Sequence, residues 1–130
     1  MAKWSHLPNA KYIDAIIASV KANPEVWNVA WDAARKSAWD AARDAARDAA
    51  RDAARDAAWD AAWDAAETKT ARDAAWDGIL ALVAYDHASK YLQMTPDQLR
   101  AWALLSEDPA AVLLIPAAIV FDKLADMEVA

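Results

Sequence analysis

The sequence predicts an all-α fold, in which one long alanine-rich helix packs with several shorter helices in a helical hairpin or bundle-like arrangement. Three observations predict it. Apolar residues, many of them alanine, make up 58% of the 130 residues. The chain has one glycine and five prolines, which leaves little scope for the tight turns of a β-rich fold. A tetrapeptide repeat without any helix breaker follows Trp27. The length is typical of one domain, so we expect a single helical domain over residues 1–130.

The first helix is expected over residues 10–22. Four apolar residues fall at positions i, i+3, i+4 and i+7, which places them on one helix face: Ile13, Ile16, Ile17 and Val20. Asn23, Pro24 and Glu25 then indicate a stop and a restart. Asn is a good N-cap, Pro suits the first helical position, and Glu favours the positive N-terminal end of a helix.

The long helix is expected over residues 24–66. From Trp27 to Trp63 a Trp or Arg recurs every four residues, and Asp follows it except at Asn28 and Lys36. Two small residues, nearly always Ala, complete each repeat. Ala and Arg are strong helix formers, so the repeat predicts one helix of about 40 residues, which would be about 60 Å long.

On a straight helix, a four-residue step overshoots a full turn by about 40°, so each column of the repeat winds slowly around the axis. This winding places four tryptophans on one side, which we predict to be buried: Trp27, Trp31, Trp59 and Trp63. It places four arginines on the opposite side, which we predict to face solvent: Arg43, Arg47, Arg51 and Arg55.

The same geometry selects candidate partner contacts. Trp39 lies at the edge of the buried sector. Small residues along the buried face would let another backbone approach closely, namely Ala41, Ala45 and Ala49. Asp52 and Asp56 also wind toward this face, where carboxylates need water or a basic partner.

The repeat loses its phase at residues 67–70 and resumes one residue out of step at Arg72. Thr70, followed three residues later by Asp73, resembles a capping arrangement. We therefore favour a turn here, and a continuous helix with a stutter is the alternative.

Two helical regions are expected after this turn. A core helix over residues 71–93 contains four apolar residues, Ile79, Leu80, Val83 and Leu92. C-terminal helices are expected over residues 96–130. Their starts are indicated by a Thr cap before Pro and Gln in Thr95-Pro96-Asp97-Gln98, and by Asp108-Pro109. Pro116 must kink or end the second of them.

Several functional classes are disfavoured. The net charge of −6 argues against direct nucleic-acid binding, which needs a surplus of basic residues. The chain has no Cys, and its one Gly provides no phosphate-binding loop or dinucleotide fingerprint. The longest apolar run, residues 110–121, is too short to span a bilayer. We expect a cytoplasmic protein without membrane contact.

Catalysis is also disfavoured. Tyr85-Asp86-His87 is the one cluster with catalytic residue types, but neighbours on a helix point in different directions, so Asp86 cannot easily orient His87. A structural role for this histidine is the favoured interpretation. We therefore expect no enzyme, no catalytic residue, no cofactor and no metal.

The repeat Trp39-Asp40-Ala41-Ala42-Arg43-Asp44 resembles a group of small, mostly uncharacterised bacteriophage proteins that carry variable runs of the same tetrapeptides. The resemblance extends to Ala81-Leu82-Val83-Ala84-Tyr85-Asp86 and to the eleven residues from Leu104 to Leu114, and it covers roughly residues 27–119. It implies a phage-encoded accessory protein that acts in a bacterial cytoplasm, and it implies no particular activity.

The function predicted is that of a non-enzymatic protein-binding accessory protein, which would act on a host or defence protein through the long helix. A structural homo-oligomer, packed through alanine-lined helix faces, is the first alternative. An acidic DNA mimic is the second, because Asp recurs about every 6 Å along the helix. Arg beside Asp makes the central repeats locally neutral, which disfavours mimicry.

Overall fold

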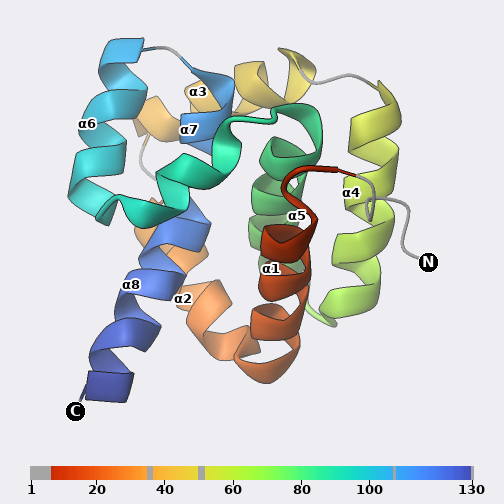
Figure 1. The fold of residues 1–130 in the computed structure, drawn as a ribbon, viewed down its shortest axis with the longest axis vertical. Helices are drawn as coiled ribbons and strands as arrows, with labels where there is room; N and C mark the ends of the chain where they lie inside the picture. Colours follow the sequence, from red (N-terminus) through yellow and green to blue (C-terminus); the bar gives the residue numbers. More distant parts are fainter. Residues whose placement is uncertain (1–6, 35–36, 50–51, 107, 130) are drawn as a thin grey trace.

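The computed structural model describes the backbone of residues 7–34, 37–49, 52–106 and 108–129, and the side chains of these ranges except 37–41, 52–55 and 126–129. Every regular element in the described ranges is helical, as predicted. In chain order (Figure 1) the elements are α1 (Ala10–Ala22), α2 (Pro24–Ala34), α3 (Ser37–Ala49), α4 (Asp52–Ala65), α5 (Lys69–Ala84), the 3₁₀ helix η1 (Ala88–Gln93), α6 (Pro96–Ser106), α7 (Pro109–Leu113) and α8 (Ile115–Val129). None of the helices in these ranges is long and apolar enough to cross a membrane.

Helix α5 is the centre of the packing. It contacts α1, α2, α4, α7 and α8, and Figure 1 shows it behind α1 with α4 alongside. Ile79, Leu80 and Leu82 are almost completely buried. At Gly78 the absence of a side chain allows close packing, because a Cβ there would lie 2.9 Å from the Cδ1 atom of Ile16 on α1. The last turns of α5, residues 78–84, are apolar on all sides and therefore need cover from several neighbours.

The expectation of one long helix over residues 24–66 is wrong. The repeat forms three helices, α2, α3 and α4, which run in different directions (Figure 1). Their main neighbours also differ: α2 packs on α5 and α8, α3 on α7, and α4 on α5. Helix propensity is a weak preference that tertiary packing overrides. A straight rod about 60 Å long could not surround α5, whereas three shorter helices bury alanines against it and against α7.

The predicted directions of the tryptophan and arginine side chains fail for the same reason, because their angles were derived for one continuous helix axis. Trp27 and Trp31 are buried, as predicted, but Trp59 and Trp63 are exposed by 38% and 52%. Arg43, expected to face solvent, is buried instead. Arg51 and Arg55 lie outside the described side chains.

The N-terminal helix boundaries follow from local chemistry. Between α1 and α2, the Asn23 carbonyl accepts hydrogen bonds from the amides of Val26 and Trp27, which is the position of an N-cap. The Asn23 side chain instead donates to the Ser19 carbonyl at the end of α1. The chain also turns between α4 and α5, where Thr68, not Thr70, is the N-cap: its hydroxyl accepts from the Ala71 amide at 3.3 Å.

The C-terminal boundaries match the sequence in most respects. Thr95 and Gln98 form a reciprocal capping box at the start of α6, with distances of 3.0 and 3.2 Å. Asp108 caps α7 by accepting from the Ala110 amide at 3.0 Å. Pro116 lies in the first turn of α8, directly after α7 has ended. The helix expected over residues 71–93 is shorter than predicted, because α5 ends at Ala84 and a 3₁₀ helix follows.

Candidate functional site

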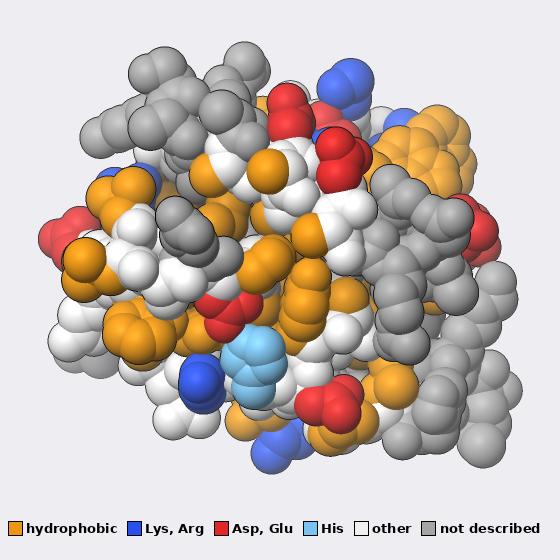
Figure 2. Space-filling view, turned by 90° about the horizontal axis from the view of Figure 1, so that it is seen from above, with side chains coloured by type: hydrophobic (Ala, Val, Ile, Leu, Met, Phe, Trp, Pro, Cys, Tyr) orange, Lys and Arg blue, Asp and Glu red, His pale blue; other side chains and the backbone are white. Residues whose placement is uncertain are grey.

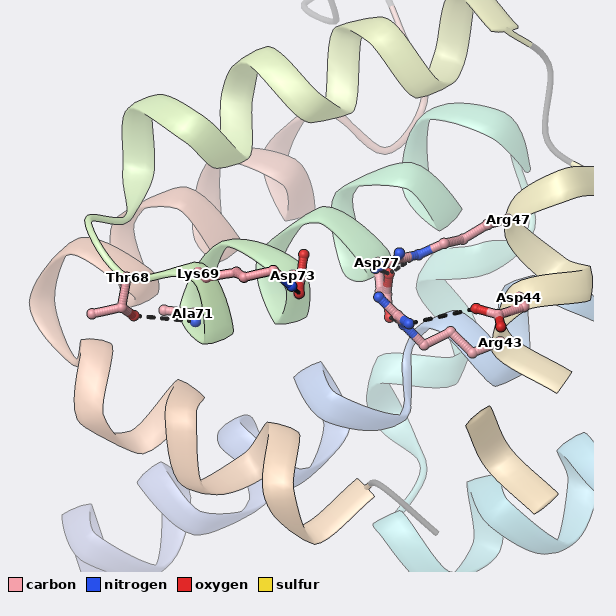
Figure 3. A network of polar contacts seen from close by, with 8 residues as sticks. All are labelled: Arg43, Asp44, Arg47, Thr68, Lys69, Ala71, Asp73 and Asp77. Atoms are coloured by element: carbon pink, nitrogen blue, oxygen red, sulfur yellow. Dashed lines mark hydrogen bonds and ion pairs between the residues drawn. The ribbon is translucent and has the colours of Figure 1, made fainter. Parts of the chain in front are cut away.

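A buried ion cluster joins α3 to α5. The Asp77 side chain is fully buried and accepts a hydrogen bond from Nε of Arg43 at 2.6 Å and from Nε of Arg47 at 2.8 Å. Nη2 of Arg47 is also 2.6 Å from Asp77 Oδ1. Both guanidinium groups point at this carboxyl, as Figure 3 shows, and Asp44 lies beside Arg43 at 3.7 Å.

The electrostatics of this cluster are those of a structural ion pair. Burial raises the pKa of Asp77 above its usual range, and the Arg43 guanidinium opposes that rise. Asp44 adds only a weak contact to this cluster, because its side chain is exposed and lies 3.7 Å from Arg43. The cluster therefore fixes where α3 sits against α5, because a carboxylate so fully buried needs its partners in place.

Arginine and tryptophan side chains stack beside this cluster. The guanidinium of Arg43 lies 4.2 Å from the ring centre of Trp31, and that of Arg47 lies 4.1 Å from Trp76. One turn before Trp76 on α5, Arg72 lies 3.7 Å from the Trp63 ring centre. The two residue types at the variable position of the repeat thus contact each other across helices through cation–π interactions.

The two tryptophans of α4 belong to a surface that lies next to these arginine–tryptophan pairs. Trp59 lies 5.6 Å from Trp63 and 5.0 Å from Trp76, measured between ring centres. Three exposed acids at four-residue spacing flank the two α4 tryptophans, namely Asp56, Asp60 and Asp64. We call this surface, made of Asp56, Trp59, Asp60, Trp63 and Asp64, the α4 face. The repeats here contain Trp where the central repeats contain Arg, so the α4 face is acidic as well as aromatic.

A second polar cluster lies at the start of α7. Nε2 of His87 is 2.7 Å from Oδ2 of Asp108, and the Tyr91 hydroxyl donates to the same oxygen. The Trp102 indole in turn donates to the Tyr91 oxygen at 3.0 Å. The partner of His87 is therefore a residue 21 positions away and not its neighbour Asp86.

Asp108 is held ionised by these contacts. Burial raises the pKa of its carboxyl, but hydrogen bonds from Tyr91, His87 and the Ala110 amide lower it, and the net pKa lies below the ordinary 3.8. Because Asp108 also caps α7, the cluster ties η1, α6 and α7 together. These contacts indicate a structural role for His87, because each side chain of the cluster is hydrogen-bonded to another one.

The described residues contain no group of three or more His, Asp or Glu placed to hold a metal ion. A polar cavity of about 410 Å³ opens beside the ion cluster. Its described lining includes Trp31, Arg43 and Arg47, with Lys69 and Asp73 paired at 2.9 Å near its edge (Figure 3).

Three of the six candidate contacts predicted from the sequence have described side chains, and they lie on two helices, α3 and α4. Ala45 and Ala49 are exposed on α3 and not on a buried face, and it is Ala46 that is buried. Asp56 is exposed on α4, where it belongs to the α4 face. The other three, Trp39, Ala41 and Asp52, lie outside the described side chains.

Sequence reasoning missed Asp77 as the partner of Arg43 and Arg47. Two features of the sequence pointed to it. The repeat shifts by one residue before Trp76-Asp77, and this Asp is followed by Gly78 and a run of large apolar residues, so it lies in a core helix. The sequence between α2 and α3 also departs from the repeat, because Lys36-Ser37 replaces the usual Asp-Ala.

A scan against protein-family models, a search of curated proteins and a search of solved structures each found no match to this chain.

Proposed function

We propose that this chain is a non-enzymatic protein-binding accessory protein and that the α4 face is its contact surface. The observation that supports this most is the exposure of two adjacent tryptophans, Trp59 and Trp63, on one helix. Tryptophan and arginine are enriched among residues that dominate binding energy at interfaces. Two large apolar rings left side by side in water favour association when a partner covers them.

The two rings are held in place before any partner arrives. Trp59 packs against Trp76 and Trp63 packs against Arg72. Arg72 is itself anchored, because its Nε donates to the Ala66 carbonyl at 2.7 Å. A surface that is already ordered loses little conformational entropy on binding, which favours affinity.

The acids of the α4 face indicate the chemistry of the partner. Asp56 and Asp64 do not take part in the ion pairs of the described side chains. Acids beside an aromatic pair complement a partner that presents basic side chains around an apolar pocket. The partner proposed is therefore a protein with a basic surface. The phage origin, and a host or defence protein as the target, rest on the sequence resemblance alone.

The absence of an enzymatic activity is part of the proposal. His87, the residue of the Tyr85-Asp86-His87 cluster most suited to catalysis, bonds to Asp108, which also accepts a hydrogen bond from Tyr91. Asp77 is fully buried between arginines. These contacts support structural roles for the residues that otherwise suggest catalysis.

The test is affinity capture from a bacterial host lysate with the intact protein and matched variants as bait. We expect a protein that the parent captures to be lost with Trp63→Ala, and its capture to weaken as salt is raised, because salt screens exposed charges. Val29→Ala is the control, since Val29 is 54% exposed on another helix. Equal capture by the parent and by Trp63→Ala would contradict the proposed surface.

A further inference from the structure

A pocket of about 430 Å³ lies at the end of α4, where the turn into α5 meets the turn between α1 and α2. Figure 1 shows both turns at the lower end of the molecule. The described residues that line the pocket are Val20, Lys21, Pro24, Asp64, Ala65, Ala66, Glu67 and Thr68. Because Asp64 also belongs to the α4 face, the pocket continues the proposed contact surface.

The lining of this pocket has an apolar part and a charged part. The apolar part consists of Val20, Pro24, Ala65 and Ala66. The charged part includes the carboxylates of Asp64 and Glu67, whose side chains are exposed. Lysine and arginine side chains combine the two matching properties, because an apolar hydrocarbon stem ends in a positively charged group. The pocket therefore has the chemistry that holds a long basic side chain.

The basic residues near the pocket leave its two carboxylates open to an external cation. Lys21 is the one basic residue in the described lining, and it takes part in none of the ion pairs of the described side chains. Lys69, the next basic residue after Glu67, is paired with Asp73 at 2.9 Å. Two carboxylates against one ammonium group make the lining acidic. At the opposite end of the molecule, which Figure 2 shows, acidic and basic side chains are interspersed among hydrophobic ones.

We infer that this pocket receives a lysine or arginine side chain of the protein partner, beside the contact that the partner makes with Trp63. The inference rests on the proposed function, because it assigns one side chain of the basic partner to one place on this chain. The stem of that side chain lies against the apolar part of the pocket, and its charged group pairs with Asp64 and Glu67. Charge complementarity of this kind sets the orientation of a partner on a surface.

A test that needs no knowledge of the partner is a titration of the intact protein with short acetylated and amidated peptides, followed by two-dimensional nitrogen–proton NMR. One peptide has a leucine between two arginines, one has it between two lysines, and one has it between two glutamates. We expect the two basic peptides to shift the amide signals of Lys21 and of residues 64–68, and the glutamate peptide to leave them unchanged. The basic peptide with the lower Kd identifies the preferred side chain.

Two variants and a control make this titration specific. Asp64→Asn combined with Glu67→Gln removes both charges with little change of size, and it should raise the Kd of the basic peptides about threefold. Lys21→Met removes the competing positive charge and should lower that Kd. Asp48→Asn is the matched control, because Asp48 is an exposed aspartate on α3, and it should bind the peptides like the parent.

The inference can fail separately from the proposed function. Basic peptides that shift none of these signals would overturn it, and so would equal Kd values for the parent and the double variant. A lysate protein that is lost with Trp63→Ala, but is captured equally by the parent and the double variant, would leave the α4 face as the contact surface and overturn the pocket. Equal capture by the parent and Trp63→Ala contradicts the proposed surface instead, and the peptide titration still decides whether the pocket binds basic side chains.

Discussion

Replacing Asp77 by asparagine removes the negative charge from the ion cluster between α3 and α5 while it keeps the size of the side chain. Asp77 is fully buried, and the Arg43 and Arg47 side chains are 10% and 17% exposed. The variant therefore leaves two nearly buried guanidinium groups without the carboxylate that neutralises them. Asp44, at 3.7 Å from Arg43, is exposed to water and compensates little of this charge.

The expected loss follows from this burial. Removing one partner of a buried ion pair costs about 3–5 kcal/mol, because the remaining charge stays desolvated without compensation. The asparagine oxygen can still accept one hydrogen bond from an arginine, so we expect a value near the lower end, about 3 kcal/mol. That is a large share of the stability of a domain of this size.

Urea unfolding, followed by circular dichroism and extrapolated to water, measures this loss. Asp48→Asn is the control, because Asp48 is an exposed aspartate of the same repeat on α3, and its replacement should cost under about 0.5 kcal/mol. Replacing the three charged residues together by Met, Met and Leu should recover much of the stability, since an apolar cluster needs no desolvated charge. Equal, small losses for Asp77→Asn and Asp48→Asn would refute the buried ion pair.

Two further predictions concern packing and pH. Gly78→Ala should lower the free energy of unfolding by about 1 kcal/mol, because crowding of Ile16 by the new Cβ outweighs the gain in helix propensity; a thermal melt of the variant above that of the parent would contradict this. Asp108→Asn should be less stable than the parent above the ordinary pKa of 3.8. The pKa of Asp108 is lowered in the folded state, so its contribution is present above that value and is lost as pH falls through the folded pKa. The gap between parent and variant, measured by urea unfolding, should therefore close in acid, and a gap that stays constant would count against the cluster with His87 and Tyr91.

Helix ends were predictable where a few consecutive residues decide them. Thr95 and Gln98 cap α6, Asp108 caps α7, and Pro116 separates α7 from α8, because each acts on backbone groups within four residues. The turn after α4 was predicted at the correct place with the wrong cap, since Thr68 and Thr70 are both suitable residues. Local chemistry could not choose between them, and in the structure it is the Thr68 hydroxyl that accepts from the first-turn amide of Ala71.

The sequence by itself determined that this protein is helical, because alanine and arginine favour helix and the chain has almost no glycine. The burial of Trp27 and Trp31 agrees with the prediction, but the same argument placed Trp59 and Trp63 inside as well, so the sequence alone did not decide which tryptophans are buried. Only the tertiary structure decided that the repeat forms three helices and that Arg43 lies inside while Trp63 lies partly outside. The physical reason is that every repeat has nearly the same local preference, so the repeat alone does not specify where the chain changes direction. That choice depends on which helices cover α5 and on the carboxylate of Asp77, which attracts Arg43 and Arg47 from 34 and 30 residues away.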